Sequence, residues 1–301
     1  MTGTVPSSVA NGGGFTAGAH LPQSGSAASP DNFVTAGRHL EDLGFACGWF
    51  SDHLVVEKGV DYPPTAYLFE CLTSLTWVAA HTSRLELGTS VLVMPMRPPT
   101  LLAKMLGSID LVSNGRLVVG VAGGYVEHEF ETLGVPFKER GRRTDEALEI
   151  VRRLWTEDPL ADEFPVHGVR FRNMRMKPSP QRHIPIWVGG HADAALRRAA
   201  GQDGWHGTLY GVDGPDEDLT RQLKTLREMR PEKEFVLSIR AMWDGLDDDH
   251  DKMLATIERL RELGVTHITG DPRQRTFDGY LRSTEALAKL FERAGATMVT
   301  A

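Results

Sequence analysis

Cysteines and long hydrophobic runs are scarce in this sequence. Only two cysteines occur among 301 residues, Cys47 and Cys71, and their spacing fits neither a disulfide framework nor a zinc site. No stretch approaches the roughly 18 consecutive apolar residues of a membrane-spanning helix. Residues 1–14 lack the basic start and apolar run of a signal peptide. We therefore expect a disordered N-terminal lead over residues 1–14 and a cytoplasmic protein that does not span a membrane.

A surplus of positive charge is also missing. The chain has 40 Asp and Glu against 33 Lys and Arg, which gives a formal net charge of −7. Such an acidic balance disfavours nucleic acid and anionic membranes as partners, so we expect a small-molecule substrate. Hydrophobic residues make up 41% and charged residues 24%, as in ordinary globular proteins.

Several common catalytic motifs are absent. The sequence contains no G-x-x-x-x-G-K-[ST] phosphate loop, no G-x-S-x-G nucleophile elbow and no H-E-x-x-H zinc helix. The run Glu127-His128-Glu129 contains metal-ligating residue types, but neighbours in sequence rarely converge on one ion. We therefore predict no metal site.

Short apolar or β-branched runs alternate with segments of helical periodicity. The predicted strands are residues 15–21, 45–51, 85–94, 116–121, 184–189, 204–209, 235–242 and 265–270. Ser29-Pro30-Asp31 predicts a helix start, because serine is a common N-cap and proline is favoured in the first turn. Eight strand–helix units favour an α/β fold of the (β/α)8 TIM-barrel type, with residues 15–301 as one catalytic domain. Residues 157–181 are interpreted as an insertion between the fourth helix and the fifth strand.

Functional residues in such barrels lie where strands end. Asp52-His53 follows the second predicted strand and could act as a proton-transfer pair or a clamp on a ring, or could merely cap the strand. The third strand, residues 87–95, has the composition of a plain core strand. Residues 55–64, 157–181 and 271–280 are expected to line the mouth of the barrel.

Glycines follow the fourth and fifth strands. Gly123-Gly124 could let a flat ligand approach the backbone, although a tight turn is the simpler interpretation. Gly189-Gly190-His191 precedes a helix whose free N–H groups could bind a phosphate. From the residues alone, the sequence predicts a barrel enzyme with a ring clamp and a phosphate site, and it does not name the cofactor.

A series of motifs resembles the bacterial luciferase-like monooxygenase family, in particular the branch that uses the deazaflavin coenzyme F420. The matching stretches are residues 43–53, 85–91, 103–104, 111–117, 120–125, 129–130, 140–146, 185–190 and 203–205. They keep the family's order from about residue 15 to residue 207, and beyond residue 208 the resemblance is mostly at the level of the fold.

The resemblance implies roles for individual residues. His53 would face the redox ring as acid or base, with Asp52 hydrogen-bonding the ring or the backbone, and Tyr125 would serve as a proton donor or an aromatic wall. Ser90–Val91 matches a pair that forms a cis peptide behind the ring. The cofactor-binding candidates are Asp52, Thr89, Ser90, Val91, Ala122, Gly123, Gly124, His128, Gly189, Gly190 and His191. Arg97 and Arg175 are candidate contacts of a polyglutamate tail.

The function implied is hydride transfer between F420 and a small organic substrate, in a homodimer by analogy with the family. Two alternatives stay open: an FMN-dependent monooxygenase that uses reduced flavin and O2, and a non-catalytic flavin-binding protein. Relatives that oxidise sugar phosphates have an acidic residue in place of Tyr125 and a tryptophan in place of Glu57. These departures disfavour a sugar-phosphate substrate.

Overall fold

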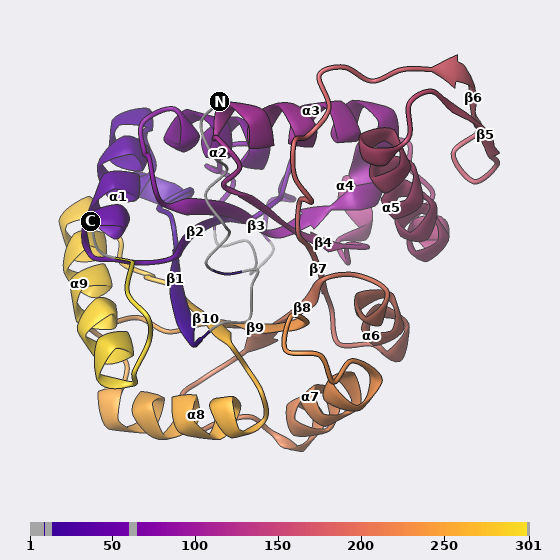
Figure 1. Cartoon of the computed structure of the whole chain (residues 1–301). Coiled ribbons are helices and arrows are strands. Elements are labelled where there is room, and N and C mark those ends of the chain that lie inside the picture. Colours follow the sequence, from indigo (N-terminus) through magenta and orange to yellow (C-terminus); the bar gives the residue numbers. More distant parts are fainter. Residues whose placement is uncertain (1–8, 10–13, 60–64, 300–301) are drawn as a thin grey trace.

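Eight parallel strands form a closed barrel at the centre of the molecule (Figure 1). The computed structural model describes residues 9, 14–59 and 65–299. Around the barrel the strand order is β1-β10-β9-β8-β7-β4-β3-β2. The strands are β1 (Thr16–His20), β2 (Cys47–Phe50), β3 (Glu86–Val93), β4 (Leu117–Ala122), β7 (Ile186–Gly189), β8 (Gly204–Leu209), β9 (Val236–Ala241) and β10 (His267–Gly270). The predicted TIM barrel is confirmed, and each strand lies within a predicted run or within one residue of it. Residues 1–8 and 10–13 of the predicted disordered lead lie outside the described residues.

Helices surround the barrel (Figure 1). They are α1 (Pro30–Asp42), α2 (Cys71–Ala79), α3 (Pro99–Val112), α4 (Glu127–Thr132), α5 (Arg140–Thr156), α6 (Asp193–Ala200), α7 (Glu217–Met229), α8 (His250–Glu262) and α9 (Phe277–Arg293). The predicted start of α1 is confirmed: the Asn32 amide donates to Ser29 Oγ over 3.1 Å, and Pro30 occupies the first turn. Within the described ranges, no helix combines the length and apolar character needed to cross a membrane.

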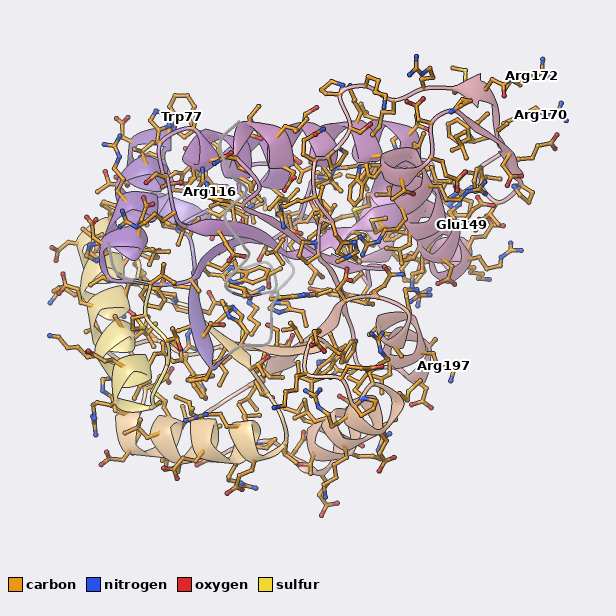
Figure 2. All side chains as sticks on the ribbon, in the orientation of Figure 1. Trp77, Arg116, Glu149, Arg170, Arg172 and Arg197 are labelled. Carbon is orange, nitrogen blue, oxygen red and sulfur yellow. The ribbon has the colours of Figure 1, made fainter. Side chains whose placement is uncertain are left out.

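A small antiparallel hairpin lies in the chain between α5 and β7. It consists of β5 (Leu160–Phe164) and β6 (Val169–Met174), which the sequence analysis did not predict. Leu160, Phe164 and Phe171 are buried, whereas most of the intervening side chains are exposed. Figure 1 shows the hairpin beyond α5, away from the barrel, and Arg170 and Arg172 lie at its outer edge in Figure 2.

Aromatic and imidazole rings fill the interior of the barrel. Trp49 stacks on His206 with ring centroids 4.9 Å apart, and Trp187 lies 5.5 Å from Trp49. The imidazoles are held by hydroxyl groups: His206 contacts Ser90 Oγ at 2.8 Å and Ser238 Oγ at 2.7 Å. Burial lowers the pKa of His206 well below its usual range, so the core ring is uncharged at neutral pH.

Arg116 immediately precedes β4 and lies at the end of the barrel at which the strands begin. Its guanidinium donates to the carbonyl oxygens of Ala79, Thr82, Leu85 and Ser113 and to the hydroxyl of Thr82. The side chain therefore joins the loop after α2, the start of β3 and the end of α3. Burial lowers the pKa of Arg116, against the opposing charges of Glu41 and Glu86. These hydrogen bonds compensate the cost of burying the cation.

We predict that Arg116→Met lowers the free energy of unfolding by about 2–4 kcal/mol, because it leaves several buried carbonyl groups without donors. Arg197→Met is the matched control, since Arg197 is exposed on α6 (Figure 2). Its effect should stay within about 0.5 kcal/mol. Urea denaturation of both variants measures the difference, and equal stabilities would show that Arg116 does not hold these loops.

Candidate functional site

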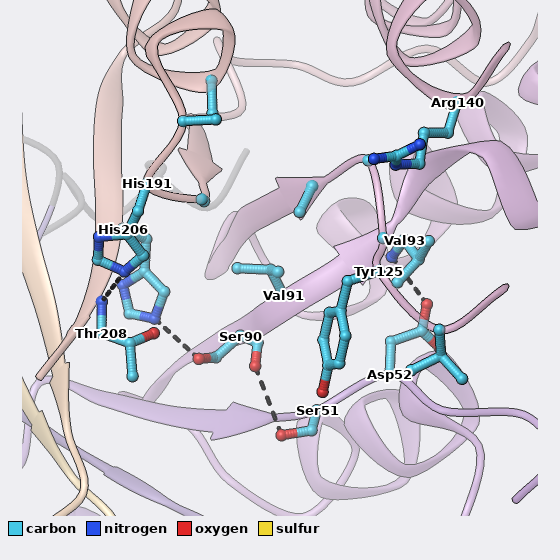
Figure 3. Close-up of a pocket in the computed structure, with 18 of the residues that line it drawn as sticks. Ser51, Asp52, Ser90, Val91, Val93, Tyr125, Arg140, His191, His206 and Thr208 are labelled. Carbon is cyan, nitrogen blue, oxygen red and sulfur yellow. Dashed lines mark hydrogen bonds between the residues drawn. The ribbon is translucent and has the colours of Figure 1, made fainter. Parts of the chain in front are cut away.

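A cavity of about 880 Å³ opens at the carboxyl ends of the strands (Figure 3). We call it the mouth cavity. Ends of β2, β3, β4, β7, β8 and β9 contribute to it, as do the first turns of α5 and α6. Among the residues predicted from the sequence, those that line it are Asp52, His53, Ser90, Val91, Ala122, Gly123, Gly124, Tyr125, Gly189, Gly190 and His191. Strand ends that are far apart in sequence therefore meet at one site.

Two predicted cofactor-binding residues do not line the mouth cavity. Thr89 is buried beneath it, and its hydroxyl donates to the Gly120 carbonyl over 2.7 Å, which joins β3 to β4. His128 is exposed on α4, where its ring pairs with Glu57 at 3.2 Å and Glu131 at 3.0 Å. These two exposed carboxylates hold the ring at the surface of the molecule.

Asp52 holds the loop after β2 in place. Its carboxylate receives two hydrogen bonds from Arg97, of 2.7 and 2.8 Å, and one of 2.9 Å from the Val93 amide (Figure 3 shows the last). Arg97 also donates to Glu70 at 2.8 Å. Burial alone would lower the pKa of Arg97, but the two carboxylates raise it. The structure thus pairs Asp52 with Arg97 and not with the adjacent His53.

His53 has a different partner, Glu129 at the start of α4. His53 Nδ1 lies 3.1 Å from Glu129 Oε2, and Glu129 Oε1 accepts the Leu54 amide over 2.7 Å. Burial favours the protonated acid, but the hydrogen bonds from His53, Leu54 and Val55 outweigh it and lower the pKa of Glu129. A carboxylate only accepts, so Nδ1 must carry a proton. In this tautomer Nε2 is the ring nitrogen that can accept a proton.

The backbone of β3 is irregular beside His53. The Ser90–Val91 peptide is cis, as the family resemblance implied, and the register with β4 shifts between Thr89 and Leu92. The Ser90 carbonyl accepts hydrogen bonds from Ser51 Oγ at 3.4 Å and from Arg240 Nη1 at 3.2 Å. In Figure 3, Val91 lies between His206 on one side and Tyr125 on the other. The isopropyl group of Val91 thus forms part of the cavity wall.

Glycines leave parts of this wall as bare backbone. Gly124 has a φ of +80° and Gly190 a φ of +107°, conformations that favour glycine. A Cβ at Gly189 would lie 3.1 Å from a Val91 methyl group. The positive φ values account for glycine at positions 124 and 190, and at position 189 the Val91 side chain packs against the backbone.

Basic side chains line one end of the mouth cavity. Lys138, Arg140 and Arg198 come from the turn before α5, from α5 and from α6. Arg198 donates to the Gly141 carbonyl, so the start of α5 and α6 adjoin. The ring of predicted His191 contacts Gln222 at 2.7 Å and the Thr208 amide at 3.2 Å. Arg198 is also paired with Asp145 at 2.6 Å, so Lys138, Arg140 and the N-terminus of α6 provide the donors suited to a phosphate.

A second cavity of about 330 Å³ adjoins the first, and we call it the side cavity. The two share Ser51, His53, Arg240 and Met242. Part of the predicted mouth loop 271–280 lines the side cavity, whereas no residue of 157–181 lines either cavity. Predicted mouth residues 60–64 lie outside the described residues. Neither Arg97 nor Arg175 lines a cavity; Arg175 pairs with Asp158 beside the hairpin.

Named relatives include proteins with two different cofactors. An F420-dependent glucose-6-phosphate dehydrogenase of Kineococcus radiotolerans is 31% identical over 208 residues, 66% of this chain and 58% of that protein. An FMNH2-dependent dimethylsulfone monooxygenase of Pseudomonas fluorescens is 34% identical over 147 residues, 46% of this chain and 40% of that protein. An uncharacterized Mycobacterium tuberculosis protein is 39% identical over 197 residues, 64% of this chain. The match spans 63% of that relative's length.

Solved structures share the fold. The monooxygenase RslO1 from Streptomyces bottropensis superposes with a TM-score of 0.76 and 21% identity, covering 93% of this chain and 100% of that one. An F420-dependent secondary alcohol dehydrogenase gives a TM-score of 0.75 and 14% identity, with 92% and 99% covered. At these identities the likeness shows the fold alone. The sequence profile of the family described as luciferase-like monooxygenase matches residues 11–261, and the chain therefore belongs to this family.

Proposed function

We propose that this protein is an oxidoreductase that transfers a hydride between the deazaflavin F420 and a small organic substrate. The observation that carries the proposal is the His53–Glu129 pair on the wall of a glycine-edged cavity with a basic end. A proton-exchanging nitrogen, a bare wall for a flat ring and donors for a phosphate are then combined at one site.

The residues present fit a phosphorylated, ring-shaped cofactor. Lys138, Arg140 and Arg198 line the end near α6, where they would hold an anionic side chain. At Gly190 a Cβ would come within 3.2 Å of the Ala195 methyl group, so the backbone at this position packs closely on the first turn of α6. The volume of about 880 Å³ lies within the range of cofactor and ligand pockets.

When bound, the deazaflavin would supply or accept the hydride. The protein contributes the remaining functions. His53 Nε2 gives or takes the accompanying proton, and the Glu129 carboxylate fixes the orientation and tautomer of the imidazole. Tyr125 lines the same cavity, and its ring lies edge-on to that of His53 with centroids 6.3 Å apart. Ser90 and Val91 line the same cavity and would contact the bound ring.

FMN is the second candidate cofactor. The FMNH2-dependent relative supports it, and the same basic end of the cavity suits its phosphate. The F420-dependent relative matches 66% of this chain against 46% for the FMNH2-dependent one, which favours F420.

The cofactor preference can be measured directly. Titration of the purified protein with F420 and with FMN, followed by cofactor fluorescence, should show F420 binding at least about tenfold more tightly, or about 1.4 kcal/mol. Tight binding of FMN without measurable binding of F420 would replace the proposal by the flavin monooxygenase.

We predict that His53→Asn leaves the Kd for F420 within about threefold of the wild-type value and lowers turnover by roughly 10²–10⁴-fold, because proton transfer is lost. Turnover is followed as reduced-F420 oxidation across a panel of ketones, aldehydes and enones. His81→Asn is the control, because His81 lines neither cavity, and this variant should retain full activity. Equal rates for wild type and His53→Asn would remove His53 from the mechanism, and wild-type inactivity with every acceptor would favour a non-catalytic flavin-binding protein.

Glu129→Gln should lower the free energy of unfolding by about 1–2 kcal/mol at pH 7, because a charged acceptor is replaced by a neutral one. The pKa of Glu129 is lowered from its ordinary 4.5, so its stabilisation is present above pH 4.5 and is lost as the pH falls through the lowered value. The difference from wild type should therefore persist down to about pH 4.5 and shrink as the pH falls further, in urea denaturation. Glu131→Gln, on the exposed side of α4, is the control. A difference that does not depend on pH would contradict the assigned charge.

A further inference from the structure

Two tyrosines at the mouth of the barrel expose most of their side chains. Tyr210 is 77% exposed and Tyr125 is 68% exposed, and both line the mouth cavity. Among the aromatic residues of the described ranges, these two are the most accessible. A single exposed aromatic side chain is ordinary, but two at one cavity provide an apolar surface that a ligand can cover.

Tyr210 is attached to a firmly held backbone. It directly follows β8, and the residues on either side of it are hydrogen-bonded. The buried Trp243 donates from Nε1 to the Gly211 carbonyl over 2.7 Å, and the Met242 amide donates to the Leu209 carbonyl over 3.0 Å. The backbone at Tyr210 is thus fixed before any ligand arrives, so binding to its ring costs little additional ordering of the chain.

Tyr125 lies beside the imidazole to which proton exchange is assigned. Its ring is edge-on to His53, with centroids 6.3 Å apart, so a molecule that packs on Tyr125 borders His53 as well. Tyr210 is on the other side of the mouth, because β8 and β2 are four strands apart in the closed barrel of eight. The two tyrosines therefore present aromatic surface at separate strand ends of one cavity, those of β4 and β8.

Apolar side chains accompany the tyrosines in the lining of the mouth cavity. They are Val91, Val93, Met96, Val126 and Met242. The cations suited to a phosphate, Lys138 and Arg140, come instead from the turn before α5 and from α5. A charged group would lose solvation against the apolar side chains without gaining a partner there, whereas an uncharged ring would gain contact.

We propose that Tyr125 and Tyr210 bind an aromatic ring of the substrate, which is a small uncharged molecule. Aromatic rings pack edge-on or offset against tyrosine and gain more than their apolar area alone provides. The assignment to the substrate rests on the proposed function, because it places a cofactor at the basic end of the same cavity. The preference for an aromatic ring can be tested without any cofactor.

The test uses cofactor-free protein with 13C-labelled tyrosine rings at pH 7.5. The probes are 2-naphthylmethanol and its saturated counterpart decahydro-2-naphthylmethanol, which share a carbon skeleton and a hydroxyl group. We expect 2-naphthylmethanol to shift the ring signals of Tyr125 and Tyr210, identified by their absence from the leucine variants, and to bind at least about threefold more tightly. A merely apolar surface would prefer the saturated alcohol, so equal or weaker binding of 2-naphthylmethanol would overturn the inference.

Substitutions of the two tyrosines separate the aromatic ring from the hydroxyl group. Tyr125→Leu and Tyr210→Leu should each weaken 2-naphthylmethanol binding about three- to tenfold, and the corresponding phenylalanine variants should stay within about twofold of wild type. The urea midpoints should not fall, because both side chains are exposed. Tyr67→Leu is the control, since Tyr67 is 57% exposed and lines neither cavity. Wild-type affinity in either Tyr125→Leu or Tyr210→Leu would contradict the proposal.

Repeating the titration with F420-saturated protein distinguishes a substrate site from a cofactor site. 2-Naphthylmethanol should bind within about threefold of its affinity for the cofactor-free protein. Displacement of the probe by F420 would show that the tyrosines contact the cofactor, and it would overturn the assignment to the substrate. If F420 fails to bind while 2-naphthylmethanol binds through both tyrosines, the recognition of an aromatic ring is supported and only the proposed cofactor is overturned.

Discussion

Arg240 joins four segments across the mouth of the barrel. Its guanidinium reaches from β9 to Asp271 after β10 at 2.7 Å, to Ser51 after β2 at 3.1 Å and to the Ser90 carbonyl of β3 at 3.2 Å. Removing a guanidinium from water is costly unless partners compensate it. Burial would raise the pKa of Asp271, but the charge of Arg240, its hydrogen bond and the other neighbouring basic groups together outweigh burial and lower that pKa. The ion pair thereby fixes the ends of these strands relative to one another.

The position of Arg240 also separates two electrostatic environments. Its charge is balanced by Asp271 on the side of β10, where His20 is neutral. The mouth cavity is lined by Lys138, Arg140 and Arg198, of which Arg198 is paired with Asp145 at 2.6 Å. An anionic group is stabilised at the basic end, and an uncharged group loses less solvation in the side cavity. His53 lines both cavities and therefore lies where they meet.

The eight barrel strands could be predicted because their signals are local. Parallel strands that are buried on both faces appear in the sequence as continuous apolar runs. The start of α1 is likewise indicated by a short motif, the N-cap Ser29 followed by Pro30. The β5–β6 hairpin could not be recognised in this way. Only Leu160, Phe164 and Phe171 of the hairpin are buried, and the charged residues between them are exposed, so no apolar run forms. Its stability comes from packing on the neighbouring helix, which a local pattern does not contain.

The features of the site also divide into those that could be predicted from local sequence signals and those that could not. In a parallel barrel every strand end reaches the same face, which is why His53 and the pairs Gly123-Gly124 and Gly189-Gly190 could be placed at one cavity from sequence. Hydrogen-bond partners depend instead on the course of the loops. Asp52 is next to His53 in sequence yet binds Arg97, while the partner of His53 is Glu129, 76 residues away. Ser51 and Arg240 are separated by 189 residues. In this fold, position at a strand end predicts which residues reach the site, whereas adjacency in sequence does not predict which of them act together.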